Sequence, residues 1–293
     1  MISYLQGAIL GLLQGIAEPF PISSLGHGVI LPRVAGWDIH QNDKFFLSFL
    51  VATHLATALV LLGFFWNDWK RIVGGILRSL KQREIRADDP DAQLGWRLVV
   101  GTIPVGIIGL LAEKPLRHVF ASAPSAAAFL FLNGVMLFAA ERLRRRAADA
   151  RALAAMEATA DADARLSKLT WRQSAAIGTA QAIGLIPGFS RSGATMSAGL
   201  VAGLDNEDAA RFSFLLATPI IGAAALLKIP DLLGPDGDGV RGPALLGAVC
   251  AAVTTFFAVK FLLRFFETNR LTPFAYYCMA AGAALTVAFA AGA

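Results

Sequence analysis

Hydrophobic side chains along this chain fall into long uninterrupted runs instead of alternating with polar ones. Six runs approach the length of about 20 apolar residues that a helix needs to cross a membrane. They lie near residues 45–66, 96–112, 125–141, 207–227, 244–264 and 273–291. Charged residues gather between the runs, so the pattern predicts an all-α, polytopic membrane protein with six transmembrane helices.

Two further segments, residues 4–35 and 172–203, are apolar but interrupted. Pro19 and Pro21 interrupt the first, and Pro187 interrupts the second. Proline cannot continue a helix and disfavours helical backbone at the residue before it. Each segment is therefore predicted to form a helix, a break and a second helix, which adds two re-entrant helix pairs to the six crossings.

The two interrupted segments resemble each other. Aligning Gln14 with Gln181 also superimposes three further identical pairs at one offset, which are Ile16 and Ile183, Ser23 and Ser190, and Gly26 and Gly193. Three predicted crossings separate equivalent points, and an odd number turns the second copy upside down. We therefore expect a single membrane domain, 1–293, with inverted repeats at about 1–143 and 171–293 and a cytoplasmic loop at 144–170.

Charge supports this arrangement. Only 16% of the residues are charged, against about 25% in soluble domains. The net charge of +5 arises largely from basic clusters at 70–86 and 142–172, which the positive-inside rule places in the cytoplasm. Topology thus accounts for the charge without a nucleic-acid partner. The loops 112–124 and 228–243 and both termini are predicted to face outward.

The first interruption carries residues suited to chemistry. Glu18 is an ionisable group in an apolar stretch, which marks a functional site unless it is a carboxylate at the membrane surface. Ser23 and Ser24 stand where a new helix would begin, and capping explains one of them. His27 falls on the same side of that helix. It is either a structural histidine or an acid or base beside the serines.

The second interruption is rich in groups that bind anions. No acidic residue lies between Arg172 and Asp205, so Arg191 needs a distant partner, either Glu18 or a ligand phosphate. Arginine matches phosphate oxygens with a planar fork of donors. Helix N-termini attract anions as well. Neighbouring groups that could join Arg191 are Gly188, Ser190, Ser192 and Thr195.

A compact, multiply charged anion held at membrane depth fits these groups, and a diphosphate on a lipid tail is such a ligand. The expected chemistry is phosphoryl transfer, in which positioning and charge neutralisation dominate. Glu18 could serve as general base or hold a divalent cation. Attack by Ser24 and attack by an activated water both remain open, with His27 as acid or base. Broken helices in inverted repeats are also typical of transporters, so a flippase of a phosphorylated polyprenyl lipid is the alternative.

The two interruptions resemble the motifs of the undecaprenyl-diphosphate phosphatases, also called bacitracin-resistance proteins. Residues 187–195, PGFSRSGAT, look like the PGxSRSxxT motif of this family. Residues 14–27 look like its (E/Q)xxxE motif followed by PxSSxGH, with Gln14 where many members have glutamate. Both motifs occur at the expected separation, and the resemblance runs from the first helix to the last.

The resemblance implies hydrolysis of undecaprenyl diphosphate to the monophosphate carrier and inorganic phosphate, for peptidoglycan synthesis and with bacitracin resistance. It implies a bacterial inner-membrane location, a site open to the outer side, and dependence on Mg²⁺ or Ca²⁺, with Glu18 as metal ligand. Expected partners are polyprenyl diphosphate and membrane lipids, and the sequence leaves open whether a second copy of the chain joins in a homodimer. The implied catalytic residues are Glu18, Ser24, His27 and Arg191. The implied substrate-binding residues are Gln14, Ser23, Gly188, Ser190, Arg191, Ser192 and Thr195.

Overall fold

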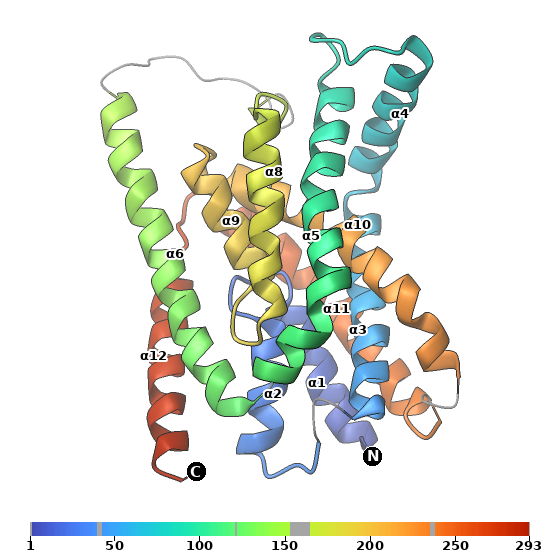
Figure 1. The fold of residues 1–293 in the computed structure, drawn as a ribbon, viewed down its shortest axis with the longest axis vertical. Coiled ribbons are helices and arrows are strands. Elements are labelled where there is room, and N and C mark those ends of the chain that lie inside the picture. The colour runs from blue at the N-terminus through green and yellow to red at the C-terminus, as the bar shows by residue number, and fades with distance from the viewer. Residues whose placement is uncertain (1, 40–42, 121, 153–164, 235–237, 293) are drawn as a thin grey trace.

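A computed structural model describes residues 2–39, 43–120, 122–152, 165–234 and 238–292. It is a bundle of helices, six of which are long and apolar enough to cross a membrane (Figure 1). These are α3 (Lys44–Phe64), α5 (Pro90–Phe120), α6 (Ala123–Ala152), α10 (Asn206–Leu233), α11 (Arg241–Phe266) and α12 (Thr272–Ala290). All six predicted spans are confirmed as apolar helices.

The two interrupted segments form broken helices, as predicted. In the first, residues 18–23 separate α1 (Tyr4–Ala17) from α2 (Ser24–Val34), and these residues together with the first turn of α2, 18–27, are here called the first break. In the second, α8 (Trp171–Ala180) and the 3₁₀ helix η1 (Gln181–Leu185) lead through residues 186–190 into α9 (Arg191–Val201), and residues 186–195 are here called the second break. The inverted repeat and the re-entrant course of these pairs through a membrane stay predictions.

The basic segment 70–86 is not a loop, as the charge pattern had suggested, because most of it forms α4 (Trp66–Gln82). Apolar residues recur on one face of α4, and Ile72 and Ile76 pack against α5 at Gly95. The charged residues occupy the other face, where Arg78 pairs with Asp89 at 3.0 Å. Hydropathy averaged over a span misses such an amphipathic helix, since its apolar residues are spaced three or four apart.

The long helices also continue beyond their apolar cores. Helix α6 extends to Ala152, into the predicted loop 142–172, and α5 covers most of the predicted loop 112–124. Apolar runs mark only the part of a helix that would sit in lipid, whereas backbone hydrogen bonding continues into water. The predicted loop 144–170 lies partly outside the described residues.

The ends of the bundle differ in character. Figure 1 shows α4 and the adjoining ends of α5, α6 and α8 at one end, and both chain termini at the other. The described parts of the two basic segments therefore share one end, and the chain termini share the opposite end with the last turns of α5 and α10 and the first turns of α6 and α11. This is the relative arrangement that the basic residues predict.

Small residues let the broken helices pack closely against the spans. A Cβ on Gly11 of α1 would lie 2.6 Å from the Cα of Gly247 in α11. A Cβ on Gly178 of α8 would likewise collide with Gly101 of α5. Close backbone approach through glycine is a common way of packing helices in membranes. These contacts hold both breaks inside the bundle.

Candidate active site

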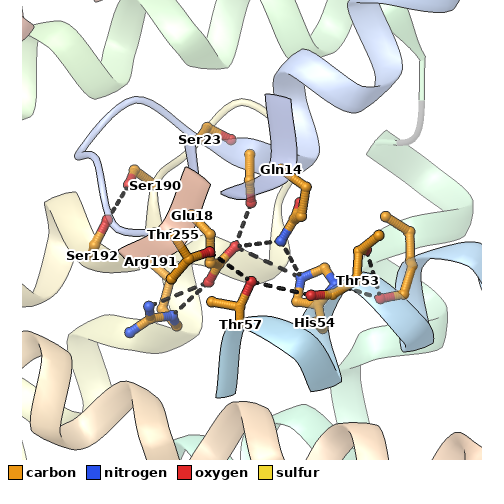
Figure 2. A network of polar contacts seen from close by, with 12 residues as sticks. Gln14, Glu18, Ser23, Thr53, His54, Thr57, Ser190, Arg191, Ser192 and Thr255 are labelled. Carbon is orange, nitrogen blue, oxygen red and sulfur yellow. Dashed lines mark hydrogen bonds and ion pairs between the residues drawn. The ribbon is translucent and has the colours of Figure 1, made fainter. Parts of the chain in front are cut away.

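The two breaks meet in the interior of the bundle (Figure 2). Ser23 caps α2 by accepting a hydrogen bond from the backbone N–H of Gly26 at 3.1 Å. The same Ser23 oxygen accepts from the backbone N–H of Gly188, in the second break, at 3.2 Å. One hydroxyl thus starts a helix in one half of the chain and binds the backbone of the other half.

Asn133 of α6 makes a second bridge between the breaks. Its amide nitrogen donates to the Pro21 carbonyl at 2.9 Å, and its amide oxygen accepts from the Ser190 N–H at 3.0 Å. The side chain is fully buried. Sequence reasoning missed Asn133, although a carboxamide inside an apolar span is itself a signal of an interhelical contact.

Backbone conformation at the breaks is unusual at two positions. Ser23 has a φ of 68°, in the left-handed region that costs a side-chain-bearing residue about 1–2 kcal/mol. Gly188 has a φ of 105°, and a Cβ there would collide with Phe129 of α6. The predicted substrate-binding residues Ser23 and Gly188 therefore shape the junction of the two breaks.

Glu18 is at the centre of the site and only 8% exposed. Its Oε1 accepts from Nε and Nη2 of Arg191, both at 3.3 Å. Its Oε2 accepts from the Ser24 hydroxyl at 2.5 Å and from the Gln14 amide at 3.2 Å. The structure thus brings together four predicted site residues. Gln14 lies in α1 and Glu18 directly after it, whereas Ser24 begins α2 and Arg191 begins α9.

Arg191 is paired with Glu18, one of the two partners that the sequence left open. The Arg191 side chain is 14% exposed, and its Nη1 is buried without a hydrogen-bond partner among the described residues. A buried, unpaired donor on a cation is costly. Arg191 therefore retains capacity for a second anion beside the carboxylate.

His27 faces away from Glu18. Its Nδ1 lies 2.7 Å from the Ser23 carbonyl, and its Nε2 lies 2.8 Å from the Tyr277 hydroxyl of α12. The two rings stack with centroids 5.9 Å apart. A carbonyl can only accept, so Nδ1 carries the hydrogen and neutral His27 accepts from Tyr277. The spacing rule placed His27 on the serine side of α2 but could not show which way its ring turns.

The remaining hydroxyls of the second break serve the backbone. Ser190 caps α9 by accepting from the Gly193 N–H at 3.0 Å, and Ser192 donates to the Phe20 carbonyl in the first break at 2.9 Å. Thr195 donates to the Arg191 carbonyl one turn back at 2.7 Å. Their predicted role in substrate binding stays a prediction, because each hydroxyl already has a structural partner.

A histidine that the sequence reasoning did not select also reaches the site (Figure 2). Nε2 of His54, on α3, lies 3.3 Å from the Gln14 amide nitrogen and 3.7 Å from Glu18 Oε2. His54 directly follows the stretch 48–53, which repeats at 213–218. An ionisable residue in the middle of an apolar span was the signal that could have found it.

The side chains around Glu18 do not form a metal site by themselves. Within the described residues there is no group of three His, Cys, Asp or Glu side chains that could hold an ion. Both Glu18 oxygens already accept hydrogen bonds, and the neighbouring Gln14 is an amide that donates to Glu18. Divalent cations are held by several oxygen ligands. Binding of Mg²⁺ or Ca²⁺ at Glu18 stays a prediction.

The fold and the site together define a polytopic helical membrane protein with a buried carboxylate–guanidinium pair at the junction of two helix breaks. The model of the family described as bacitracin resistance protein BacA matches residues 7–284. The chain therefore belongs to this family.

Curated relatives match the chain over almost its whole length. An undecaprenyl-diphosphatase of Mycolicibacterium paratuberculosis is 48% identical over 98% of this chain and 97% of the relative. Undecaprenyl-diphosphatase 2 of Frankia alni is 44% identical over 99% of this chain and 98% of its own length. Undecaprenyl-diphosphatase 2 of Chromobacterium violaceum is 42% identical, with 95% and 96% coverage. The family suggested by the two sequence motifs is thus confirmed.

Proposed function

We propose that this protein hydrolyses undecaprenyl diphosphate to undecaprenyl phosphate and inorganic phosphate, and so recycles the lipid carrier for peptidoglycan synthesis. One observation carries the proposal: Glu18 Oε2 accepts from the Ser24 hydroxyl at 2.5 Å while Glu18 Oε1 neutralises Arg191. One buried carboxylate can therefore act as a base toward a serine nucleophile and also pairs with an arginine that could bind phosphate. The same activity accounts for resistance to bacitracin in this family.

Substrate binding uses the positive groups of the site. The first N–H groups of α2 and α9 have no partners inside their own helices, and both helices begin beside Glu18. The unpaired Nη1 of Arg191 adds a charged donor. These groups would hold the terminal phosphate next to Ser24 and offset the charge that develops during phosphoryl transfer.

Ser24 is the nucleophile in the mechanism that the geometry favours. Glu18 takes the Ser24 proton, and Oγ attacks the terminal phosphorus while the bond to the bridging oxygen breaks. Undecaprenyl phosphate leaves. Water then attacks the phosphoserine, the proton on Glu18 returns to the Ser24 oxygen, and inorganic phosphate departs. His27 takes no part in these steps, because its two ring nitrogens form hydrogen bonds with the Ser23 carbonyl and the Tyr277 hydroxyl.

The decisive test is phosphate release by purified protein in detergent, where no gradient exists. Wild type should release phosphate from undecaprenyl diphosphate, and Ser24→Ala should not accumulate a phosphorylated protein. A wild type that binds the lipid without releasing phosphate would instead favour the flippase. Normal turnover by Ser24→Ala would assign the attack to water.

The site is proposed to open to the outer side of the bacterial inner membrane. The basic segments lie at one end of the bundle, and α2 lies in the half that holds the chain termini (Figure 1). The positive-inside rule then turns that half outward. In a variant without Cys250 and Cys278, an impermeant thiol reagent added to intact cells should label Asp238→Cys and spare Leu80→Cys. The reverse pattern would invert the orientation.

A further inference from the structure

Of the histidines whose side chains the structure describes, His27 and His54 lie near the site, and His54 contacts Gln14. His27 is turned toward Tyr277, whereas His54 Nε2 lies within 3.3 Å of the Gln14 amide. His54 is half-buried, with 28% of its side chain exposed. The proposed mechanism gives His54 no role, although this side chain extends from α3 to the residues around Glu18 (Figure 2).

The contacts of His54 determine the tautomer of its neutral imidazole ring. Its Nδ1 lies 2.8 Å from the Leu50 carbonyl, which can only accept, so Nδ1 carries a hydrogen. In neutral His54 the Nε2 atom then has a free lone pair, which points at the Gln14 amide. The backbone of α3 therefore determines which nitrogen of the imidazole faces the site.

The tautomer of His54 in turn determines the orientation of the Gln14 side-chain amide. The Gln14 nitrogen has two hydrogens and lies 3.2 Å from Glu18 Oε2 and 3.3 Å from His54 Nε2. Both neighbours accept, so each takes one hydrogen. Turning the amide over would place its oxygen against the Glu18 carboxylate and the imidazole lone pair. Gln14 is thus held as a double donor, a role that glutamate could not fill without a proton or a cation.

His54 does not reach Glu18 directly. The distance of 3.7 Å between Nε2 and Glu18 Oε2 exceeds that of a hydrogen bond. Any influence on Glu18 therefore passes through Gln14, whose N–H and the Ser24 hydroxyl converge on the same oxygen, Oε2.

We propose that His54 is a positioning residue of the phosphatase reaction: it locks the Gln14 amide as a donor to Glu18 Oε2 and thereby keeps that oxygen aimed at the Ser24 hydroxyl. The chain of contacts runs from the Leu50 carbonyl through His54 and Gln14 to Glu18. It links α3 to the nucleophile without placing His54 in contact with substrate. The inference rests on the proposed function, since Glu18 acts here as the base.

The test compares side chains that differ in reach. Glutamine can place an acceptor near the position of the histidine Nε2, whereas asparagine is too short. His54→Gln should keep at least about half of the wild-type kcat, and His54→Asn and His54→Leu should lose roughly five- to tenfold, the scale of one hydrogen bond. KM for undecaprenyl diphosphate should change less than about twofold, because Arg191 and the helix N-termini remain.

Two further variants exclude a general packing effect. Thr57→Val removes a buried hydroxyl one turn along α3, where it bonds Thr255, and should keep the wild-type kcat. In a Gln14→Ala background, His54→Asn should cause no additional loss, because its target is already absent.

Full activity of His54→Asn, equal losses in His54→Asn and His54→Gln, or multiplicative losses with Gln14→Ala would each overturn the positioning role. A wild type without phosphatase activity would instead refute the proposed function itself.

Discussion

The two breaks are built alike but carry different chemistry. Ser23 and Ser190 occupy equivalent positions, and each caps the helix that follows and binds the opposite break. At the same alignment, however, Leu185 stands where the first break has Glu18, and Arg191 stands where it has Ser24. The two breaks thus have the same kind of cap and bridging hydrogen bond, whereas the reactive groups are divided between them.

Each break alone holds only part of the reactive groups. The first break supplies a carboxylate and a hydroxyl, and the second supplies a guanidinium, so neither is complete alone. Glu18 and Arg191 are both largely buried, and their pairing avoids the high cost of leaving either charge buried alone. Four predictions test this contrast, beginning with the largest effect.

Removing the charge of the first break should have the greatest consequence. Glu18→Gln keeps the shape of the side chain but abolishes the base, so kcat should fall by about 10²–10⁴-fold. Undecaprenyl diphosphate should still bind in equilibrium measurements, because Arg191 is released from its partner. Glu84→Gln, outside the site, is the control. Joint loss of binding and activity would recast Glu18 as a structural partner of Arg191.

Changing the cation of the second break should come next. Arg191→Lys preserves the charge but loses the planar fork, so the rate should fall on the order of 10²–10³-fold, as for loss of a preorganised donor. The variant should fold, which thermal unfolding in detergent can check. Arg86→Lys, an exposed residue paired with Asp88, serves as the matched control. Near-normal phosphate release by Arg191→Lys would remove Arg191 from phosphate binding.

The glutamines at equivalent positions should behave differently. Gln14 donates to Glu18, whereas the side-chain nitrogen of Gln181 donates to the Gly178 carbonyl of its own segment, at 3.5 Å. Gln14→Ala should lower kcat by about tenfold, the scale of a hydrogen bond to a charged group. Gln181→Ala should leave kcat unchanged. Steady-state kinetics on the two variants measure the difference, and equal effects would mean that Gln181 also contributes to catalysis.

Replacing the capping serine of either break should give the smallest effects, and the two effects should be similar in size. Ser23→Ala and Ser190→Ala each remove a helix cap and a bond between the breaks, so each should lower the free energy of unfolding by about 1–2 kcal/mol. Ser3→Ala removes a cap at α1 that contacts neither break, and should cost less. Unfolding temperatures of the purified variants in detergent provide the comparison. Loss in only one of the two breaks would show that their roles have diverged.

Much of this architecture could be predicted from the sequence alone. The six spans are set by apolar runs because lipid requires them, and the two broken helices follow from proline chemistry. The motifs around Glu18 and Arg191 likewise indicated the family. These features are local, since each depends on residues close together in the chain.

The tertiary structure decided which side chains from distant segments contact each other. It paired Glu18 with Arg191, turned His27 toward Tyr277, and brought His54 and Asn133 to the breaks from helices far along the chain. The apolar spacing of α4 is present in the sequence but lost in averaged hydropathy, and only the structure shows that this face packs against α5. Ring orientation, hydrogen-bond direction and contacts between distant helices depend on the packed backbone, and no spacing within a single segment encodes them.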